Sequence, residues 1–262
     1  MRKSMLVLCS AAALVSPGLA AAQQAAAQAP YTLSANAGLF SQYVFRGLTQ
    51  TNAKPALQGG FDLAHSSGLY AGTWASNVSW LADFGSYESS SLEWDFYGGY
   101  KGAIGASGFS YDVGLLQYYY PGTVASGATK ANTLEGYGGV GWKWLTAKLS
   151  YSLGDKTFGV PDSRGTYYVD LGASYPATEK LSLLAHYGFQ HFRGSNAGVS
   201  NGSLASYKDW KLGASYALPQ SFTVGAYLTG TDMNATREAF YTTPAGKFVG
   251  KSAATAYLQK SF

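Results

Sequence analysis

Apolar and polar residues alternate in the first segment of the chain that has a clear pattern, which begins near residue 31. One face carries Tyr31, Leu33, Ala35, Ala37 and Leu39, and Tyr43 and Phe45 keep the same phase. The opposite face carries Thr32, Ser34, Asn36 and Gln42. A period of two residues is typical of a β-strand with one apolar and one polar face. A polar loop, residues 46–55, then leads to a second alternating segment at 57–63.

The same rhythm continues to the last residue and predicts about twelve strands. Their approximate ranges are 31–45, 57–63, 69–80, 92–101, 109–120, 134–142, 145–153, 167–175, 181–192, 209–216, 222–230 and 254–262. The predicted connections alternate in length. The short ones lie at 65–68, 102–108, near 144, 176–180 and 219–221, and the long ones at 46–55, 81–91, 121–131, 154–165, 193–206 and 231–250.

Long loops at one end and short turns at the other are typical of up-and-down outer-membrane barrels. A β-sandwich with Greek-key crossovers does not alternate so regularly. The sequence therefore predicts an all-β fold, a single antiparallel transmembrane β-barrel with short periplasmic turns and longer extracellular loops. An even number of strands places both termini at the end with the short turns.

The N-terminus predicts export through a cleaved signal peptide, residues 1–22. Arg2 and Lys3 precede an apolar run at 5–14, and small residues at 20–22 fit a cleavage site. This run is shorter than the roughly 20 residues that a membrane-spanning helix needs. Residues 23–30, rich in Ala and Gln, are predicted to be disordered, and residues 31–262 to form the barrel. Because Cys9 leaves with the signal peptide, the mature chain forms no disulfide within itself and no thiolate metal site.

Composition narrows the class of protein further. Charged residues make up 12% of the chain, against about 25% in a typical soluble domain, and aromatic residues make up 15%. Without Arg2 and Lys3 the chain keeps 16 of its 18 basic residues against 14 acidic ones, a net charge of about +2 that gives no reason to expect nucleic-acid binding. A secreted β-sandwich and a bacterial outer-membrane barrel both remain compatible with these numbers.

Aromatic and glycine residues support the barrel. Aromatic side chains crowd near the strand ends, which is typical of rings at a lipid boundary, although packing in a soluble core also explains them. Glycines inside strands, such as Gly98 and Gly138, weaken a sheet. They also leave room for a ring from the neighbouring strand and allow the sheet to curve.

Several long motifs resemble one family. The stretches SQYVFRGLTQTNAKPALQGGFD, GLYAGTWASNV, EWDFYGGY, YDVGLLQYYYPG, YYVDLGASY, HYGFQHF and YKDWKLGASY follow one another over nearly the whole mature chain. In this order they resemble the TorF-family porins, the Gcw_chp family of bacterial outer-membrane proteins. The resemblance implies an outer-membrane barrel that acts as a channel, and it implies little about the solute.

Charged residues gather on one phase of the predicted strands. A charge that faces lipid at mid-depth costs about 2–4 kcal/mol for Lys or Arg, so this phase is expected to face the lumen. The predicted pore-lining residues are Asp62, Glu93, Asp95, Lys101, Asp112, Glu135, Lys143, Asp170, His186, Asp209 and Lys211. They either line a water-filled path with a mild preference for cations or pair as salt bridges that plug a narrow lumen.

Catalytic and metal-binding patterns are weak. His65 and Ser66 lie in a short turn, and His191 has no acidic residue close to it in sequence. His186 and His191 are five residues apart, on opposite faces of one strand, so they are not joint metal ligands. We predict no enzymatic activity, no cofactor and no metal. The expected partners are outer-membrane lipid and small polar solutes or ions, and the sequence leaves the oligomeric state open. A plugged structural or adhesive barrel and, less favoured, a barrel enzyme are the alternatives.

Overall fold

The computed structural model describes residues 30–262. Both the predicted signal peptide, residues 1–22, and nearly all of the predicted disordered segment, residues 23–30, lie outside it. Among the described residues, twelve antiparallel strands close into a barrel. Their bounds are β1 (Tyr31–Phe40), β4 (Ala56–His65), β5 (Leu69–Asn77), β7 (Leu92–Ala103), β8 (Phe109–Tyr119), β10 (Thr133–Trp142), β11 (Leu145–Ser152), β12 (Tyr167–Pro176), β13 (Leu181–His191), β16 (Tyr207–Leu218), β17 (Phe222–Asp232) and β18 (Ala253–Ser261).

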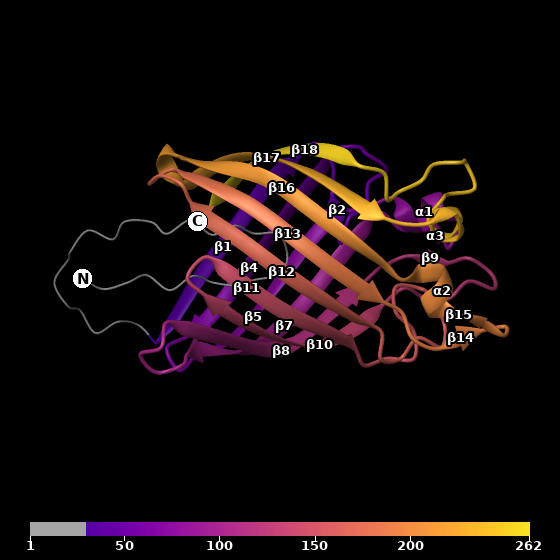
Figure 1. Ribbon diagram of the computed structural model, residues 1–262, viewed down its shortest axis with the longest axis horizontal. Helices are drawn as coiled ribbons and strands as arrows, with labels where there is room; N and C mark the ends of the chain where they lie inside the picture. The colour runs from indigo at the N-terminus through magenta and orange to yellow at the C-terminus, as the bar shows by residue number, and fades with distance from the viewer. Residues whose placement is uncertain (1–29) are drawn as a thin grey trace.

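Each strand of the barrel pairs with its neighbours in the chain, and β1 pairs with β18 to close the wall. The short turns and the C-terminus lie at one end of the barrel, here called the turn end, and the long connections lie at the other, the loop end (Figure 1). The predicted fold class and the alternation of connection lengths are therefore confirmed.

The long connections carry small elements of their own. These are β2 (Val44–Phe45), β3 (Leu48–Thr49), α1 (Trp80–Asp83), β6 (Tyr87–Ser89), β9 (Thr123–Val124), β14 (Ser195–Asn196), β15 (Val199–Ser200), α2 (Asn201–Ala205) and α3 (Ala235–Phe240), while a 3-10 turn, Pro219–Ser221, joins β16 to β17 at the turn end. No helix within residues 30–262 is long and apolar enough to cross a membrane.

The outer face of the barrel is apolar. Large side chains stand exposed there and pair across strands, as Leu39 does with Leu57 and Leu212 with Leu228. Trp94 at the loop end and Trp142 at the turn end are also exposed, 41% and 38%. A continuous apolar face of this kind is stable in hydrocarbon and is rare on a soluble monomer.

The aromatic residues near strand ends divide between the two faces. Trp94, Trp142 and Trp144 face outward as the predicted girdles require, whereas Trp74, Tyr118 and Tyr120 are buried inside the barrel. The girdle interpretation therefore fits only the outward rings. The others pack inside the barrel and not in the core of a soluble domain, because an alternating strand presents its rings to both faces.

Two glycines named from the sequence, Gly98 and Gly138, do not face a ring: a Cβ at Gly98 would lie 3.2 Å from the backbone oxygen of Tyr70, and one at Gly138 would lie 3.9 Å from Val113 Cγ1. Other glycines within the strands do make room for rings. A side chain added at Gly225 would lie 2.4 Å from the ring of Tyr257, and one added at Gly72 would lie 2.5 Å from the ring of Tyr97. Gly225 and Gly72 therefore provide the space that a tyrosine of the neighbouring strand fills.

The structure differs from the prediction where the first strand ends. Strand β1 stops at Phe40, so Tyr43 and Phe45 do not continue its outward apolar face. They turn into the barrel instead, where Tyr43 is 6% exposed and Phe45 packs on the ring of Tyr118. The alternation in the sequence continues past Phe40, but the extended backbone of the strand ends there.

Candidate functional site

The connection between β1 and β4 folds into the barrel as a short hairpin. Strands β2 and β3 pair through Val44 with Thr49 and Phe45 with Leu48, leaving Arg46 and Gly47 as a two-residue turn. Both turn residues have positive φ, 45° and 78°. This is the backbone shape of the hairpin turns whose twist matches that of paired strands. We call residues 43–50 the inner hairpin.

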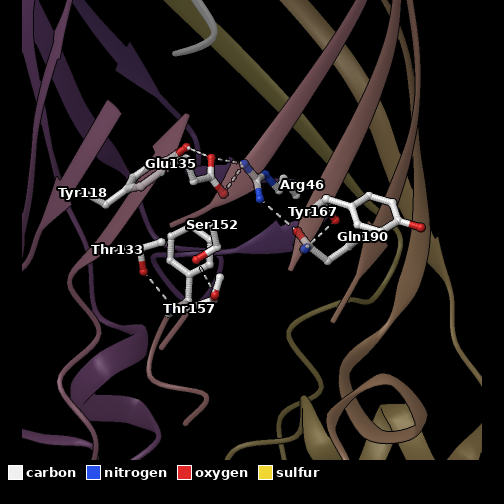
Figure 2. A network of polar contacts seen from close by, with 9 residues as sticks. Arg46, Tyr118, Thr133, Glu135, Ser152, Thr157, Tyr167 and Gln190 are labelled. Carbon is white, nitrogen blue, oxygen red and sulfur yellow. Dashed lines mark hydrogen bonds and ion pairs between the residues drawn. The ribbon is translucent and has the colours of Figure 1, made fainter. Parts of the chain in front are cut away.

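The tip of the inner hairpin crosses the lumen and binds the far wall (Figure 2). Arg46 Nη2 donates to Glu135 Oε2 on β10 at 2.7 Å, and Arg46 Nη1 donates to Gln190 Oε1 on β13 at 2.9 Å. The hydroxyl of Tyr207 on β16 donates to the carbonyl oxygen of Arg46 at 2.9 Å. Strands β11 and β12 separate β10 from β13, so one side chain bridges two distant parts of the wall.

The Arg46 guanidinium is enclosed by rings as well as by its ion pair. Its central carbon lies 4.3 Å from the centre of the Tyr168 ring, 4.8 Å from that of Phe45 and 5.6 Å from that of Phe158. The side chains of Arg46 and Glu135 are only 6% and 2% exposed. Burial opposes the charged form of Arg46, yet the adjacent Glu135 carboxylate outweighs it and raises the pKa of Arg46 above its ordinary value. Arg46 therefore remains a cation.

Two further carboxylates lie beside the inner hairpin on β7. Glu93 accepts hydrogen bonds from the hydroxyls of Tyr43 at 2.6 Å and Tyr120 at 2.7 Å. Asp95 is 3% exposed, and its Oδ1 has no hydrogen-bond partner among the described residues. The loop half of the lumen is thus filled by buried polar groups and rings.

A second polar network lies toward the turn end of the barrel. The hydroxyl of Tyr70 contacts both Asp112 and the hydroxyl of Tyr137. Lys101 Nζ lies 4.7 Å from the centre of the Tyr70 ring. In the same part of the wall, the hydroxyl of Tyr97 donates to Asp62 Oδ1 at 2.7 Å. Acidic and basic groups therefore alternate around this part of the lumen, with tyrosines between them.

The third network centres on His186. Its Nδ1 lies 3.0 Å from Asp170 Oδ1, and its Nε2 lies 2.8 Å from Asp209 Oδ1. Lys211 is the register partner of His186 on β16, and Tyr168 donates to Asp209 Oδ2 at 2.9 Å. Carboxylates only accept, so both ring nitrogens donate to them when the ring is protonated, and His186 then adds a positive charge to the wall.

Most of the predicted pore-lining residues lie on the inner face of the barrel. The exception is Lys143, which occupies the turn between β10 and β11 because β10 ends at Trp142. The Nζ of Lys143 lies 4.3 Å from the centre of the Trp142 ring, at the turn end. The structure brings together Glu93 with Asp95 and His186 with Asp170 and Asp209.

Sequence reasoning missed two cations of this site. Lys148, on β11, is the register partner of Asp170 and lies 3.9 Å from the centre of the Tyr137 ring. Lys148 shares the polar phase of the predicted strand with Thr146 and Ser150, and this pattern indicates that its side chain faces the lumen. Arg46 lay in a predicted polar loop, and nothing in that pattern indicated that the loop turns inward.

The candidate catalytic pairs have simple structural explanations. His65 Nδ1 lies 2.8 Å from Ser67 Oγ within one exposed turn, and the backbone N–H of Ser67 donates to the same ring nitrogen at 3.2 Å. His191 packs against the ring of Tyr167 at the loop end. Within residues 30–262, no group of three or more His, Cys, Asp or Glu side chains is arranged to hold a metal ion.

A closed antiparallel barrel with an apolar outer face and a charged inner wall is the fold of outer-membrane porins. Solved structures that are similar to it include the following three. The KdgM porin in complex with disordered oligogalacturonate has a TM-score of 0.50 and 11% identity, covering 87% of this chain and 99% of that one. The NanC porin has a TM-score of 0.49 and 9% identity, covering 87% of this chain and 98% of that one. The COG4313 outer membrane channel from Pseudomonas putida F1 has a TM-score of 0.47 and 10% identity, covering 94% of this chain and 100% of that one. At 11% identity, the likeness to the KdgM porin concerns the fold alone.

The chain belongs to the family described as "Bacterial protein of unknown function (Gcw_chp)", whose model matches residues 24–262. The family predicted from the sequence motifs is thereby confirmed, whereas the narrower TorF designation remains a prediction. No curated protein matches the chain.

Proposed function

We propose that this protein is a channel of the bacterial outer membrane through which small polar solutes or ions diffuse passively. The observation that carries the proposal is the contrast between the two faces of the wall. Leucine pairs such as Leu212 and Leu228 cover the outside, while carboxylates, lysines and tyrosines line the inside. A polar wall enclosed by an apolar surface is the arrangement that conducts polar solutes past lipid.

The charges on the inner wall favour cations mildly. The inner side of the barrel carries seven carboxylates and four cationic side chains. The carboxylates are Asp62, Glu93, Asp95, Asp112, Glu135, Asp170 and Asp209, and the cations are Lys101, Lys148, Lys211 and Arg46. This leaves an excess of three negative charges when His186 is neutral and two when it is protonated. A low-dielectric wall concentrates that field on the path of an ion, so cations are enriched and anions depleted.

The inner hairpin sets how wide the path is. The Arg46 and Glu135 side chains are almost fully buried, so their ion pair occupies part of the lumen at this level. We propose that conduction follows movement of the hairpin tip away from β10 and β13. The topology supports this, because β2 and β3 pair only with each other and contribute no strand to the closed barrel.

A plugged structural or adhesive barrel is the second candidate. The near-complete burial of Arg46 with Glu135, and of Glu93 with its two tyrosines, favours it. We expect no lipase or protease activity, because the His65 and Ser67 contact lies within a single turn and serves that turn's hydrogen bonding.

Planar-bilayer recording under a salt gradient distinguishes these candidates. We expect ion conductance with a cation-selective reversal potential that moves toward zero in Glu93→Gln/Asp95→Asn, because two wall charges are removed. The preference should also shrink at high salt, since charges are screened over about 10 Å at 0.1 M. The matched control is Glu179→Gln, which neutralises an exposed carboxylate in the turn between β12 and β13.

Three outcomes decide the matter. Anion selectivity would refute the sign of the proposed preference. A reversal potential that responds equally to the Glu179 control would refute the assignment to the inner wall. Absence of conductance, both in the natural protein and in a variant with a loosened hairpin, would favour the plugged barrel.

A further inference from the structure

A cavity of about 260 Å³ lies on the loop side of the inner hairpin. Every long connection of the barrel contributes to its lining, through Phe45, Trp80, Ala131, Phe158, Phe192 and Tyr241. Because these connections are far apart in the sequence, the cavity exists only when all of them fold over the barrel mouth together. We call it the outer cavity.

Nine of the 21 residues that line the outer cavity are aromatic. Trp80 meets Tyr120 edge-to-face with ring centres 5.5 Å apart, and Phe45 meets Phe158 in the same way at 5.6 Å. An apolar cavity of about 150 Å³ accommodates benzene, so 260 Å³ holds one substituted ring. The walls therefore fit a planar apolar body rather than a hydrated ion.

The floor of the outer cavity supplies one charge. Among the described residues that line it, Arg46 is the only charged one. Its bonds to Glu135 and Gln190 use at most three of the five N–H donors of a guanidinium, so donors remain for a ligand. An anion buried next to an arginine gains a charge-assisted hydrogen bond, whereas a buried cation there would meet like charge.

We propose that the outer cavity binds an aromatic monocarboxylate, with its ring among the aromatic walls and its carboxylate at Arg46. This inference rests on the proposed channel function, because Arg46 also anchors the hairpin tip to Glu135 and Gln190. The inner wall below the hairpin favours cations, so the bound carboxylate is a ligand of the cavity and not the conducted solute. A ligand carboxylate at the remaining donors of Arg46 shares the guanidinium with Glu135, which couples occupancy of the cavity to the contact that holds the hairpin tip.

Isothermal titration calorimetry on the full protein in detergent tests the ligand class, with benzoate, benzamide and acetate as probes. We expect benzoate to bind, benzamide to bind about tenfold to hundredfold more weakly because it lacks the charge, and acetate to show no binding because it lacks the ring. Equal affinities for benzoate and benzamide, or no binding of benzoate, would overturn the proposal.

Two variants test the position of the site. Arg46→Gln/Glu135→Gln removes both charges while keeping side chains of similar shape, and it should weaken benzoate binding about tenfold or more. Arg164→Gln is the matched control, because Arg164 pairs with Asp155 in an exposed loop, 65% and 82% exposed, and does not line the cavity. If the control and the double variant behave alike, the proposal fails.

A third variant covers the case in which the double variant does not fold. Val160→Phe adds volume to the cavity lining outside the barrel wall and leaves Arg46 in place. We expect it to abolish benzoate binding, and unchanged binding would place benzoate elsewhere. Conductance of the same preparation separates the two proposals, since a conducting protein that does not bind benzoate refutes this site alone. A protein that binds benzoate but does not conduct refutes only the channel.

Discussion

At the scale of single residues, Gly47 decides whether the inner hairpin reaches the far wall. Its φ of +78° is a conformation that L side chains rarely adopt. A Cβ at this position would also lie 2.6 Å from Asp209 Cβ and 2.8 Å from Thr231 Cγ2. Two separate reasons therefore require glycine here: the positive φ of the turn, and the lack of space for a Cβ beside β16 and β17.

We therefore expect Gly47→Ala to displace the hairpin tip and increase single-channel conductance. The backbone strain alone costs about 1–2 kcal/mol, and the contact with the wall adds to it. Gly246→Ala is the matched control, because Gly246 has nearly the same φ, +79°, but nothing lies within 4 Å of its added Cβ. Equal conductance of both variants and the natural protein would contradict the role assigned to the hairpin.

Individual residues also mark the limit of what the sequence predicts. The alternation of Asp62, Glu93 and Glu135 with apolar neighbours indicates an inner face, since burying a charge in lipid is costly. Arg46 carries no such signal, because its position depends on contacts with residues 89 and 144 positions away. A periodic pattern describes a strand and contains no information about the direction in which a loop folds.

At the scale of elements, neighbouring strands fit together through tyrosine and glycine pairs. Gly225 on β17 leaves space for the ring of Tyr257 on β18, and that ring stacks on Phe40 with centres 5.0 Å apart. Because Tyr257 is held from the other side, it has little freedom to move away. The pattern of glycines could be predicted from the sequence, but the particular partner of each could not, since it depends on the register.

Gly225→Ala should therefore destabilise the barrel by about 1–3 kcal/mol, the usual cost of overpacking a filled site. Gly138→Ala on β10 is the control, because the nearest atom to its added Cβ is 3.9 Å away, and we expect it to change stability little. Urea unfolding in detergent, followed by tryptophan fluorescence, measures both. A midpoint for Gly225→Ala equal to that of the control would show that the ring is not constrained.

At the scale of the whole molecule, the apolar outer face governs where the protein folds. Its twelve strands leave no unpaired edge, so the backbone N–H and C=O groups of the strands are hydrogen-bonded within the wall. Only the side chains contact the surroundings. The alternation of the sequence predicted this arrangement well, because inside and outside differ in polarity along each strand.

We expect the mature chain to show β-type circular dichroism in detergent or lipid and to migrate differently on gels before and after heating. In water without detergent the exposed leucines should cause aggregation. A soluble, folded monomer in plain buffer would contradict the membrane-embedded barrel and favour a secreted sandwich.

The position of the inner hairpin has a consequence for assembly. The hairpin follows β1 directly, and β1 is the strand whose pairing with β18 completes the wall. Its anchors lie on β10, β13 and β16, so the tip gains its complete binding site only once β16 is in place. We therefore expect the hairpin tip to bind no earlier than the placement of β16, two strands before β18 closes the wall.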